Sequence, residues 1–152
     1  MDRAEIDIAA PPEAVYDLVA DVTNMGRWSP ECRRCEWIDG ATSPAVGARL
    51  KGWNQGKAHG IPVRWTTVST VRQADHGKAF SFETKDSGAR WTYSFEATPT
   101  GCHVVETRED SVKPLLAKVF GFIVGPANRE AAQVDGMHAT LQRLKAAAES
   151  AA

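Results

Sequence analysis

Residues 89–109 read ARWTYSFEATPTGCHVVETRE, and large and polar side chains alternate in this stretch on both sides of one tight turn. Alternation with a period of two places Trp91, Tyr93 and Phe95 on the same face of a strand. The run Pro99-Thr100-Gly101 is typical of a turn. The stretch therefore predicts two antiparallel strands joined as a hairpin, and this hairpin sets the fold class.

The same alternation continues upstream of this hairpin. Turn dipeptides such as Asp39-Gly40 and His76-Gly77 separate the alternating segments. Because the connections are so short, antiparallel hairpins are favoured over parallel crossovers. The predicted strands are 3–8, 32–39, 46–54, 62–72, 78–85, 89–97 and 102–109.

Three further segments have helical patterns. Pro11-Pro12 can open a helix, because proline is tolerated in a first helical turn. A second short helix is expected over residues 23–28, and a long one from near residue 126 to about 149. The apolar stripe of the long helix is predicted at Ala127, Ala131, Val134, Met137 or His138, Leu141, Leu144 and Ala148. This order predicts an α+β fold, as one domain over 1–152, in which a bent antiparallel sheet wraps the terminal helix.

Composition excludes several classes of function. The net charge of −1 and the pI of about 6.4 give no electrostatic reason to expect a nucleic acid as partner. The N-terminus lacks the apolar core of a signal peptide, and the apolar run 115–124 is too short to cross a bilayer. Three cysteines suit a reducing compartment. We therefore expect a cytoplasmic protein, monomeric or homodimeric, that is not integrated into a membrane.

The predicted strands carry both bulky aromatic residues and small polar ones. The aromatic residues are Trp37, Trp53, Trp65, Phe80, Phe82, Trp91, Tyr93 and Phe95, and the polar ones include Asn54, Thr66, Thr67, Ser69, Ser81 and Thr92. This mixture suits a mostly apolar cavity with a few polar anchors. It equally suits an ordinary core with its hydroxyl groups on the solvent face, and strand parity alone leaves both readings open.

Familiar catalytic and metal motifs are absent from the sequence or incomplete. Cys32 and Cys35 have the spacing of a metal or redox motif, but on a regular strand they would point to opposite faces. We expect both thiols to be free, with no metal and no cofactor bound. The run 52–58 (GWNQGKA) misses the spacing of a phosphate loop and is predicted to be a strand end with a hairpin loop.

Three ionisable residues have two possible placements each. His138 borders the apolar stripe of the long helix, so it either keeps one nitrogen in water or faces a pocket. Glu106 and Arg108 lie two residues apart and share a strand face. With only strand parity to use, we favour the solvent side, as an ion pair, over the pocket wall for this pair.

Taken together, the motifs resemble the START/Bet v 1-like (SRPBCC) superfamily, and within it the small bacterial proteins of the polyketide cyclase/dehydrase type. The resemblance rests on IDIAAPPEAVYDLVADV (6–22), MGRWSPEC (25–32), VGARLKGWN (46–54), RWTTVSTV (64–71), KAFSFE (78–83), WTYSFEATPTGCHVVE (91–106) and GMHATLQRLKAAAE (136–149). It covers nearly the whole chain. It implies a helix-grip fold, with a bent seven-stranded antiparallel sheet around the C-terminal helix and a deep apolar cavity.

The resemblance also implies a hydrophobic ligand such as a lipid or polyketide. Binding or carriage of such a molecule is the first hypothesis, a cyclase/aromatase-like enzyme the second, and a regulatory or interaction protein the third. A buried histidine or carboxylate with a perturbed pKa would favour the enzyme. The resemblance carries over no catalytic residue.

We expect a cavity of several hundred Å³, the usual scale of ligand sites, between the sheet and the long helix. Its predicted lining is Leu50, Gly52, Asn54, Trp65, Thr67, Phe82, Trp91, Tyr93, Val134 and His138. The apolar segment 115–124 is expected to form a mobile entrance to it.

Overall fold

The computed structural model describes residues 1–111 and 129–151, and its strands form one antiparallel sheet of seven. The order in the sheet is β1-β7-β6-β5-β4-β3-β2, so the first strand of the chain pairs with the last. The strands are β1 (Asp2–Ile8), β2 (Cys32–Ile38), β3 (Arg49–Ala58), β4 (Ile61–Asp75), β5 (Ala79–Thr84), β6 (Arg90–Thr98) and β7 (Gly101–Glu109). The predicted strands and the α+β class are confirmed.

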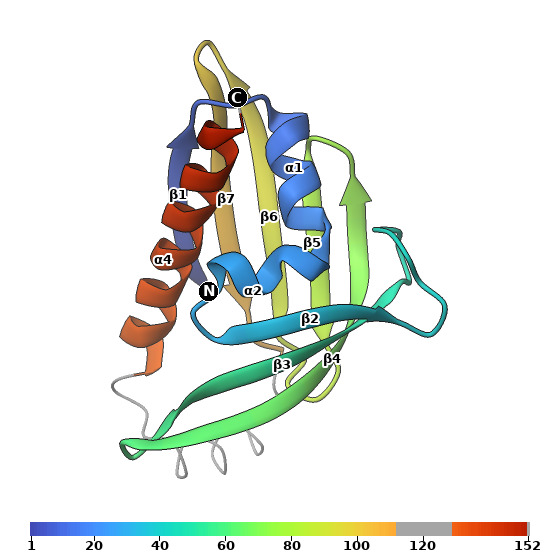
Figure 1. The fold of residues 1–152 in the computed structure, drawn as a ribbon, viewed down its shortest axis with the longest axis vertical. Coiled ribbons are helices and arrows are strands. Elements are labelled where there is room, and N and C mark those ends of the chain that lie inside the picture. Colours follow the sequence, from blue (N-terminus) through green and yellow to red (C-terminus); the bar gives the residue numbers. More distant parts are fainter. Residues whose placement is uncertain (112–128, 152) are drawn as a thin grey trace.

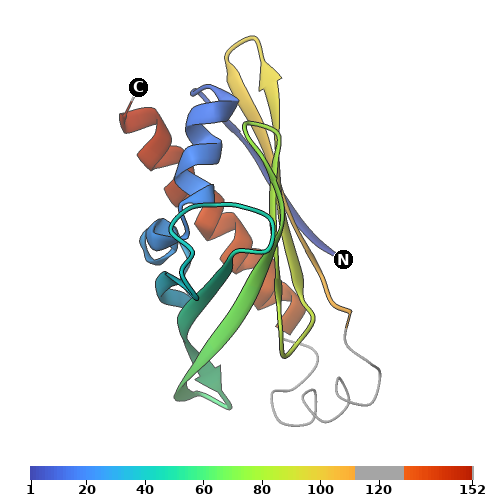
Figure 2. The same cartoon turned by 90° about the vertical axis from the view of Figure 1, so that its right-hand side faces the viewer.

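All described helices lie on one side of this sheet (Figure 2). They are α1 (Pro12–Ala20), the 3₁₀ turn η1 (Val22–Asn24), α2 (Met25–Trp28) and the long α4 (Arg129–Ser150). In Figure 1, β2, β3 and β4 cross the lower part of the molecule at a steep angle to β6 and β7, so the sheet is strongly bent. This arrangement is the helix-grip fold that the sequence predicted. None of the helices in residues 1–111 and 129–151 is long and apolar enough to span a membrane.

The buried face of α4 follows its predicted stripe from Val134 to Ala148, whereas Ala131, also predicted to lie on this stripe, is exposed. Met137, Leu141 and Leu144 are at most 1% exposed, and Val134 is half-buried. Burying side chains of this size contributes about 1.5–3 kcal/mol each. The stripe therefore holds the helix to the inner side of the fold, as expected. Ala127 and the proposed entrance segment 115–124 lie outside the described residues.

Polar contacts fix the C-terminal half of α4 against the first strand. The Lys145 ammonium donates to the backbone carbonyl of Asp7 at 2.8 Å. The Glu149 carboxylate accepts from the backbone N–H of Ala9 at 3.0 Å and pairs with Lys145 at 2.6 Å. The last turns of the chain are thus tied to the strand that begins it.

The β3–β4 hairpin is longer than the sequence suggested. We predicted a loop within residues 52–58, but β3 continues to Ala58 and pairs there with Ile61. His59 and Gly60 form the turn, both with positive φ (51° and 79°). Two such residues match the twist of the flanking strands, so the hairpin can close in two residues.

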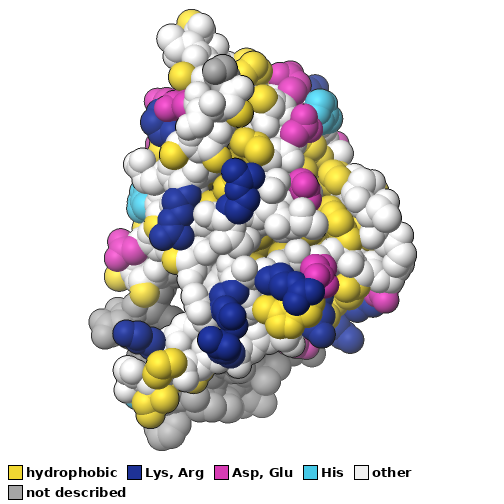
Figure 3. Space-filling view, in the orientation of Figure 1, with side chains coloured by type: hydrophobic (Ala, Val, Ile, Leu, Met, Phe, Trp, Pro, Cys, Tyr) yellow, Lys and Arg dark blue, Asp and Glu magenta, His cyan; other side chains and the backbone are white. Residues whose placement is uncertain are grey.

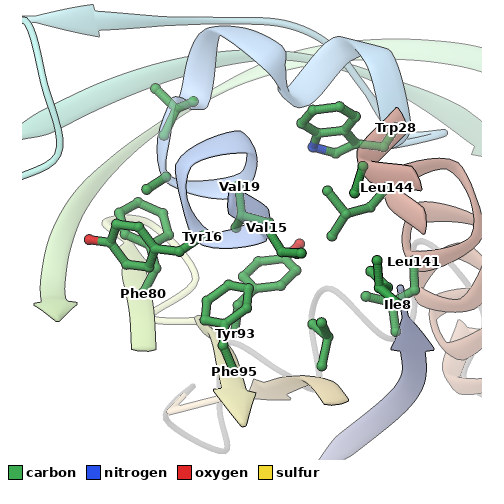
Figure 4. Close-up of a cluster of buried hydrophobic side chains, with 14 of the residues drawn as sticks. Ile8, Val15, Tyr16, Val19, Trp28, Phe80, Tyr93, Phe95, Leu141 and Leu144 are labelled. Carbon is green, nitrogen blue, oxygen red and sulfur yellow. The ribbon is translucent and has the colours of Figure 1, made fainter. Parts of the chain in front are cut away.

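The two faces of the sheet differ in character. On the inner face, a cluster of buried apolar side chains fills the space under α1 (Figure 4). On the outer face, Trp53 is flanked by Arg34 and Lys51, whose cationic groups lie 4.6 Å and 5.1 Å from its ring centroid. Basic side chains on the face seen in Figure 3 form separate groups rather than one continuous patch.

Candidate functional site

The centre of the inner face contains one buried carboxyl group. The pairing of β6 with β7 places Tyr93 opposite Glu106, and the pairing of β6 with β5 places Phe80 beside Tyr93. Glu106 is 1% exposed. The expectation that it faces solvent is therefore wrong. Residues paired across an antiparallel ladder share a face, so Glu106 must face inward wherever Tyr93 does.

The hydrogen bonding of Glu106 is incomplete. The Tyr93 hydroxyl donates to its Oε1 at 2.8 Å, but its Oε2 is buried with no hydrogen-bond partner among the described residues. Burial raises the pKa of Glu106 to about 8, although the Tyr93 hydrogen bond acts in the opposite direction. The pKa of Tyr93 is also raised, mainly by its burial and to a lesser extent by the nearby Glu106 carboxyl group. The pair is therefore neutral near pH 7, with hydroxyl protons available inside an apolar environment.

Arg108 shares the inner face with Glu106 but belongs to a different network. Its guanidinium pairs with Asp2 at 3.4 Å and with Asp110 at 2.8 Å, and it lies 5.6 Å from the centroid of the Trp91 ring. Its side chain is 17% exposed. The pair Glu106 and Arg108 is thus split, with the carboxyl group inside and the guanidinium at the boundary.

Neutral polar groups line the inner face of β3 and β4. The Asn54 amide donates to the Thr67 hydroxyl at 3.1 Å. Gly52 lies opposite Thr67, and a Cβ at position 52 would come within 3.1 Å of the Thr67 Oγ1. The missing side chain therefore leaves room next to these two polar groups. Further along the same face, the Ser69 and Thr84 hydroxyls are hydrogen-bonded at 3.1 Å.

The two cysteines of β2 face the same side, which corrects the expectation that they would point apart. The register of β2 against β3 shifts between Cys32 and Arg34. The bulge adds one residue to the strand, so Cys32 and Cys35 both turn inward and are both buried. The thiols are free, and the hydrogen bond between them lowers the pKa of Cys32 and raises that of Cys35.

The bend of the sheet brings the edge strand β2, which carries Cys32, close to the centre of the inner face. The Cys32 sulfur would lie 3.6 Å from a Cβ at position 52, and Cys32 is also near enough to Tyr93 to raise its pKa. We call the groups gathered here the polar interior, defined as Cys32, Asn54, Thr67, Tyr93 and Glu106. Its members come from β2, β3, β4, β6 and β7.

The structure brings most of the predicted site residues to the inner face. Leu50, Phe82 and Tyr93 are at most 7% exposed, and Trp91 is half-buried. Trp65 lies on the same face as Asn54 but is 38% exposed, beside Gly56 near the end of the hairpin. His138 is exposed, which corrects the expectation that it faces the interior. The cavity itself stays a prediction.

The prediction of the site missed Glu106, although a signal for it was present. The hairpin read from residues 89–109 pairs Ala97 with Cys102, and this register places Glu106 opposite Tyr93. Because paired residues share a face, the prediction that Tyr93 faces the interior also implied that Glu106 faces the interior. In the described part of the chain, no three His, Cys, Asp or Glu residues could together hold a metal ion.

Comparison with protein families gives a match over nearly the whole chain. The matching profile is described as polyketide cyclase/dehydrase and lipid transport, and it covers residues 3–149. A search of curated proteins found no match.

Solved structures with a similar fold come from several bacteria. A Polyketide_cyc-like protein from Corynebacterium glutamicum is 31% identical, with 94% of this chain and 87% of that chain covered and a TM-score of 0.63. An AHSA1-like protein from Aeromonas hydrophila is 21% identical, with 98% and 92% covered and a TM-score of 0.65.

A third similar structure is the di-domain ARO/CYC protein StfQ from the steffimycin biosynthetic pathway. The two structures superpose with a TM-score of 0.73 at 13% sequence identity. The match covers 97% of the present chain but only 50% of StfQ. At such low identity, this likeness and that to the Aeromonas protein show the fold alone.

Proposed function

The chain belongs to the polyketide cyclase/dehydrase and lipid transport family, and we propose that it binds a hydrophobic small molecule against the inner face of its sheet. The observation that carries the proposal is the buried carboxyl group of Glu106, whose Oε2 has no partner in the described residues. A buried polar group without a partner destabilises a fold by about 1–3 kcal/mol. A bound molecule that supplies the missing partner would recover this free energy.

The surroundings of Glu106 support an apolar ligand with few polar atoms. Phe82 and Trp91 are paired neighbours on the inner face, two ladder positions along from the Phe80–Tyr93 pair. Asn54 and Thr67 add neutral anchors that are less costly to bury than charges. Ligand sites for small molecules have this composition, with aromatic walls and a small number of placed polar groups.

Titration with a neutral, apolar fluorescent dye tests the proposal. Wild type should bind the dye, and Gly52→Trp should abolish binding, because the indole would fill the space beside Thr67. Gln55→Trp is the matched control, because Gln55 is exposed on the same strand. A folded Gly52→Trp protein with unchanged dye affinity would overturn the proposal, as would absence of binding by wild type.

Acid–base catalysis of the cyclase/dehydratase type is a second candidate, and one specific observation favours it. The pKa of Glu106 lies near 8 because of burial, and general acids work best when their pKa is close to the working pH. The unpartnered Oε2 could donate a proton to a ligand oxygen, with the Tyr93 hydroxyl holding Oε1 in place.

Turnover of a β-hydroxyketone tests this second candidate. Loss of water would convert it to the α,β-unsaturated ketone, which is followed by its ultraviolet absorbance. An enzyme should accelerate this elimination, and Glu106→Gln should lose the acceleration while still binding the dye. Dye binding by wild type without any acceleration above buffer would leave binding as the function.

A further inference from the structure

The two oxygens of the Glu106 carboxyl group are in different situations. Oε1 accepts the Tyr93 hydroxyl at 2.8 Å, and Oε2 is buried without a hydrogen-bond partner among the described side chains and backbone. Tyr93 is itself 7% exposed and pairs directly with Glu106 across the ladder. The hydroxyl therefore holds the carboxyl group in one orientation, with Oε2 as its free end.

The free oxygen is a hydrogen-bond donor at neutral pH. Burial raises the pKa of Glu106 to about 8, so the group is mostly protonated at pH 7. Because Oε1 already accepts from Tyr93, the acid proton is placed on Oε2. A protonated carboxyl group offers one O–H donor, and this donor has no acceptor among the residues that the structure describes. What the site lacks is therefore an acceptor atom.

Resting on the function proposed above, we propose that Glu106 recognises an uncharged ligand through a carbonyl or similar acceptor oxygen, and that the site discriminates against ligands with a carboxylate. The O–H of Glu106 would donate to this oxygen, completing the hydrogen bonding of both groups. The rest of the ligand would lie against the aromatic side chains of the inner face.

The charges near Glu106 support discrimination against an anion. A carboxylate would need a cation as partner, because a second negative charge in a dry site is costly to bury. Arg108 is the cation on the same face of β7, and it is already paired with Asp2 on β1 and with Asp110.

The other described titratable groups near this region supply no positive charge. They are Tyr93 on β6, whose hydroxyl donates to Glu106, and the thiol of Cys32 on β2. From position 131 onward, the buried residues of α4 are Met137, Thr140, Leu141, Leu144 and Ala148, none of which carries a charge.

A matched pair of competitors tests this recognition. Methyl dodecanoate and dodecanoate share a chain and a carbonyl group, but only the second is charged at pH 7. Each is titrated against the protein loaded with the neutral dye, the ester below its solubility limit and dodecanoate below its critical micelle concentration. The ester should displace the dye at a concentration at least about tenfold lower than dodecanoate, which corresponds to about 1.4 kcal/mol.

Two variants at position 106 separate the effect of the hydrogen-bond donor from that of the size and shape of the side chain. Glu106→Gln keeps an N–H donor at the same place, so the preference for the ester should persist. Glu106→Leu removes the donor, so the affinity for the ester relative to that for the dye, both measured on the same variant, should fall about tenfold. If the leucine variant does not fold, wild type alone suffices, because its affinity for the ester should fall between pH 7 and pH 9 as Glu106 ionises.

Each result is decisive. Equal displacement of the dye by the ester and by dodecanoate would overturn the recognition while leaving dye binding intact. Tighter binding of a third competitor, the cationic dodecylamine, than of the ester would do the same. Dye binding that neither competitor displaces would also overturn it. Failure of wild type to bind the dye at all would instead remove the proposed function, and the recognition with it.

Discussion

Under α1, Tyr16 packs edge-to-face against Phe80 and Phe95, with ring centroids 6.3 Å and 5.8 Å away. Next to these rings, on the paired strands β6 and β7, Tyr93 and Glu106 share one hydrogen bond and leave a carboxyl oxygen without a partner in the described chain. We call the first group, Tyr16, Phe80 and Phe95, the aromatic end. The sheet thus carries two neighbouring regions on one face that are built from different chemistry.

The contrast separates stability from function. The aromatic end buries large apolar surface in favourable ring geometry, and such pairs add about 0.5–1.5 kcal/mol beyond the area buried. The polar interior buries groups that would be more stable in water, including a carboxyl group that stays protonated only because it is buried. We infer that the aromatic end stabilises the fold enough to tolerate the unfavourable burial of Glu106 beside it. A buried carboxyl group with a shifted pKa is typical of a functional site.

The largest expected effect comes from truncating the aromatic end. Phe80 is fully buried, and Phe80→Ala should lower the free energy of unfolding by about 3–5 kcal/mol, because the truncation leaves a cavity. Chemical denaturation monitored by circular dichroism measures it. Trp53→Ala on the outer face is the control and should cost far less. Equal losses at the two positions would contradict the division into a stabilising inner end and an exposed outer face.

Replacing Glu106 should change how stability depends on pH. Its folded pKa of about 8 lies above the ordinary glutamate value of 4.5, so the folded state holds a proton that the unfolded state releases between these values. Wild-type stability should therefore fall as pH rises through this window, by up to about 1.4 kcal/mol per pH unit. Glu106→Gln removes this dependence, so its advantage over wild type should grow from pH 5 to pH 7 by roughly 3 kcal/mol.

Taking the difference between the two proteins isolates the contribution of Glu106. Other shifted groups, such as the half-buried His103, whose pKa is raised by its hydrogen bond to Asp7, are common to both and cancel. The measurement is urea unfolding of both proteins at several pH values. A difference that stays constant across this range would show that Glu106 is ionised in the folded state at neutral pH.

Removing the partner of Glu106 should have an intermediate effect. Tyr93→Phe keeps the ring but leaves Oε1 without its donor, so the free energy of unfolding should fall by about 1–3 kcal/mol. The pKa of Glu106 should also rise further, because the hydrogen bond that favours the carboxylate is lost. Infrared absorption of the protonated carboxyl group, followed against pH, checks the direction, and a downward shift would contradict it.

The sequence predicted the fold well because the fold depends on patterns that are local. Alternation and turn dipeptides placed all seven strands, and threefold and fourfold spacing placed the buried stripe of α4. The errors occurred where an irregularity changes the pattern. The bulge between Cys32 and Arg34 has no sequence signature, and it reversed the predicted orientation of Cys35 relative to Cys32.

The site was harder to predict because it depends on pairing between strands. Tyr93 was placed correctly, whereas Glu106 was assigned to solvent although the same hairpin joins them. Strand parity alone could not decide between the two faces, and the solvent side was favoured for Glu106, but the register of the hairpin decided the outcome. His138 failed for a different reason, because neighbouring positions on a helix are separated by a large rotation and Met137 takes the inward one.

The smallest effect is expected where the inner face is polar but fully paired. Ser69 and Thr84 share one buried hydrogen bond at 3.1 Å, and Ser69→Ala should lower the free energy of unfolding by about 1 kcal/mol by leaving Thr84 alone. Adding Thr84→Val removes the second hydroxyl, so the double variant should recover most of that loss. Both variants should bind the neutral dye as wild type does, since this pair needs no ligand to complete it. Impaired dye binding in the double variant would show that the ligand site extends beyond the polar interior to Ser69 and Thr84. Complete hydrogen bonding of a polar group would then not mark it as lying outside the site.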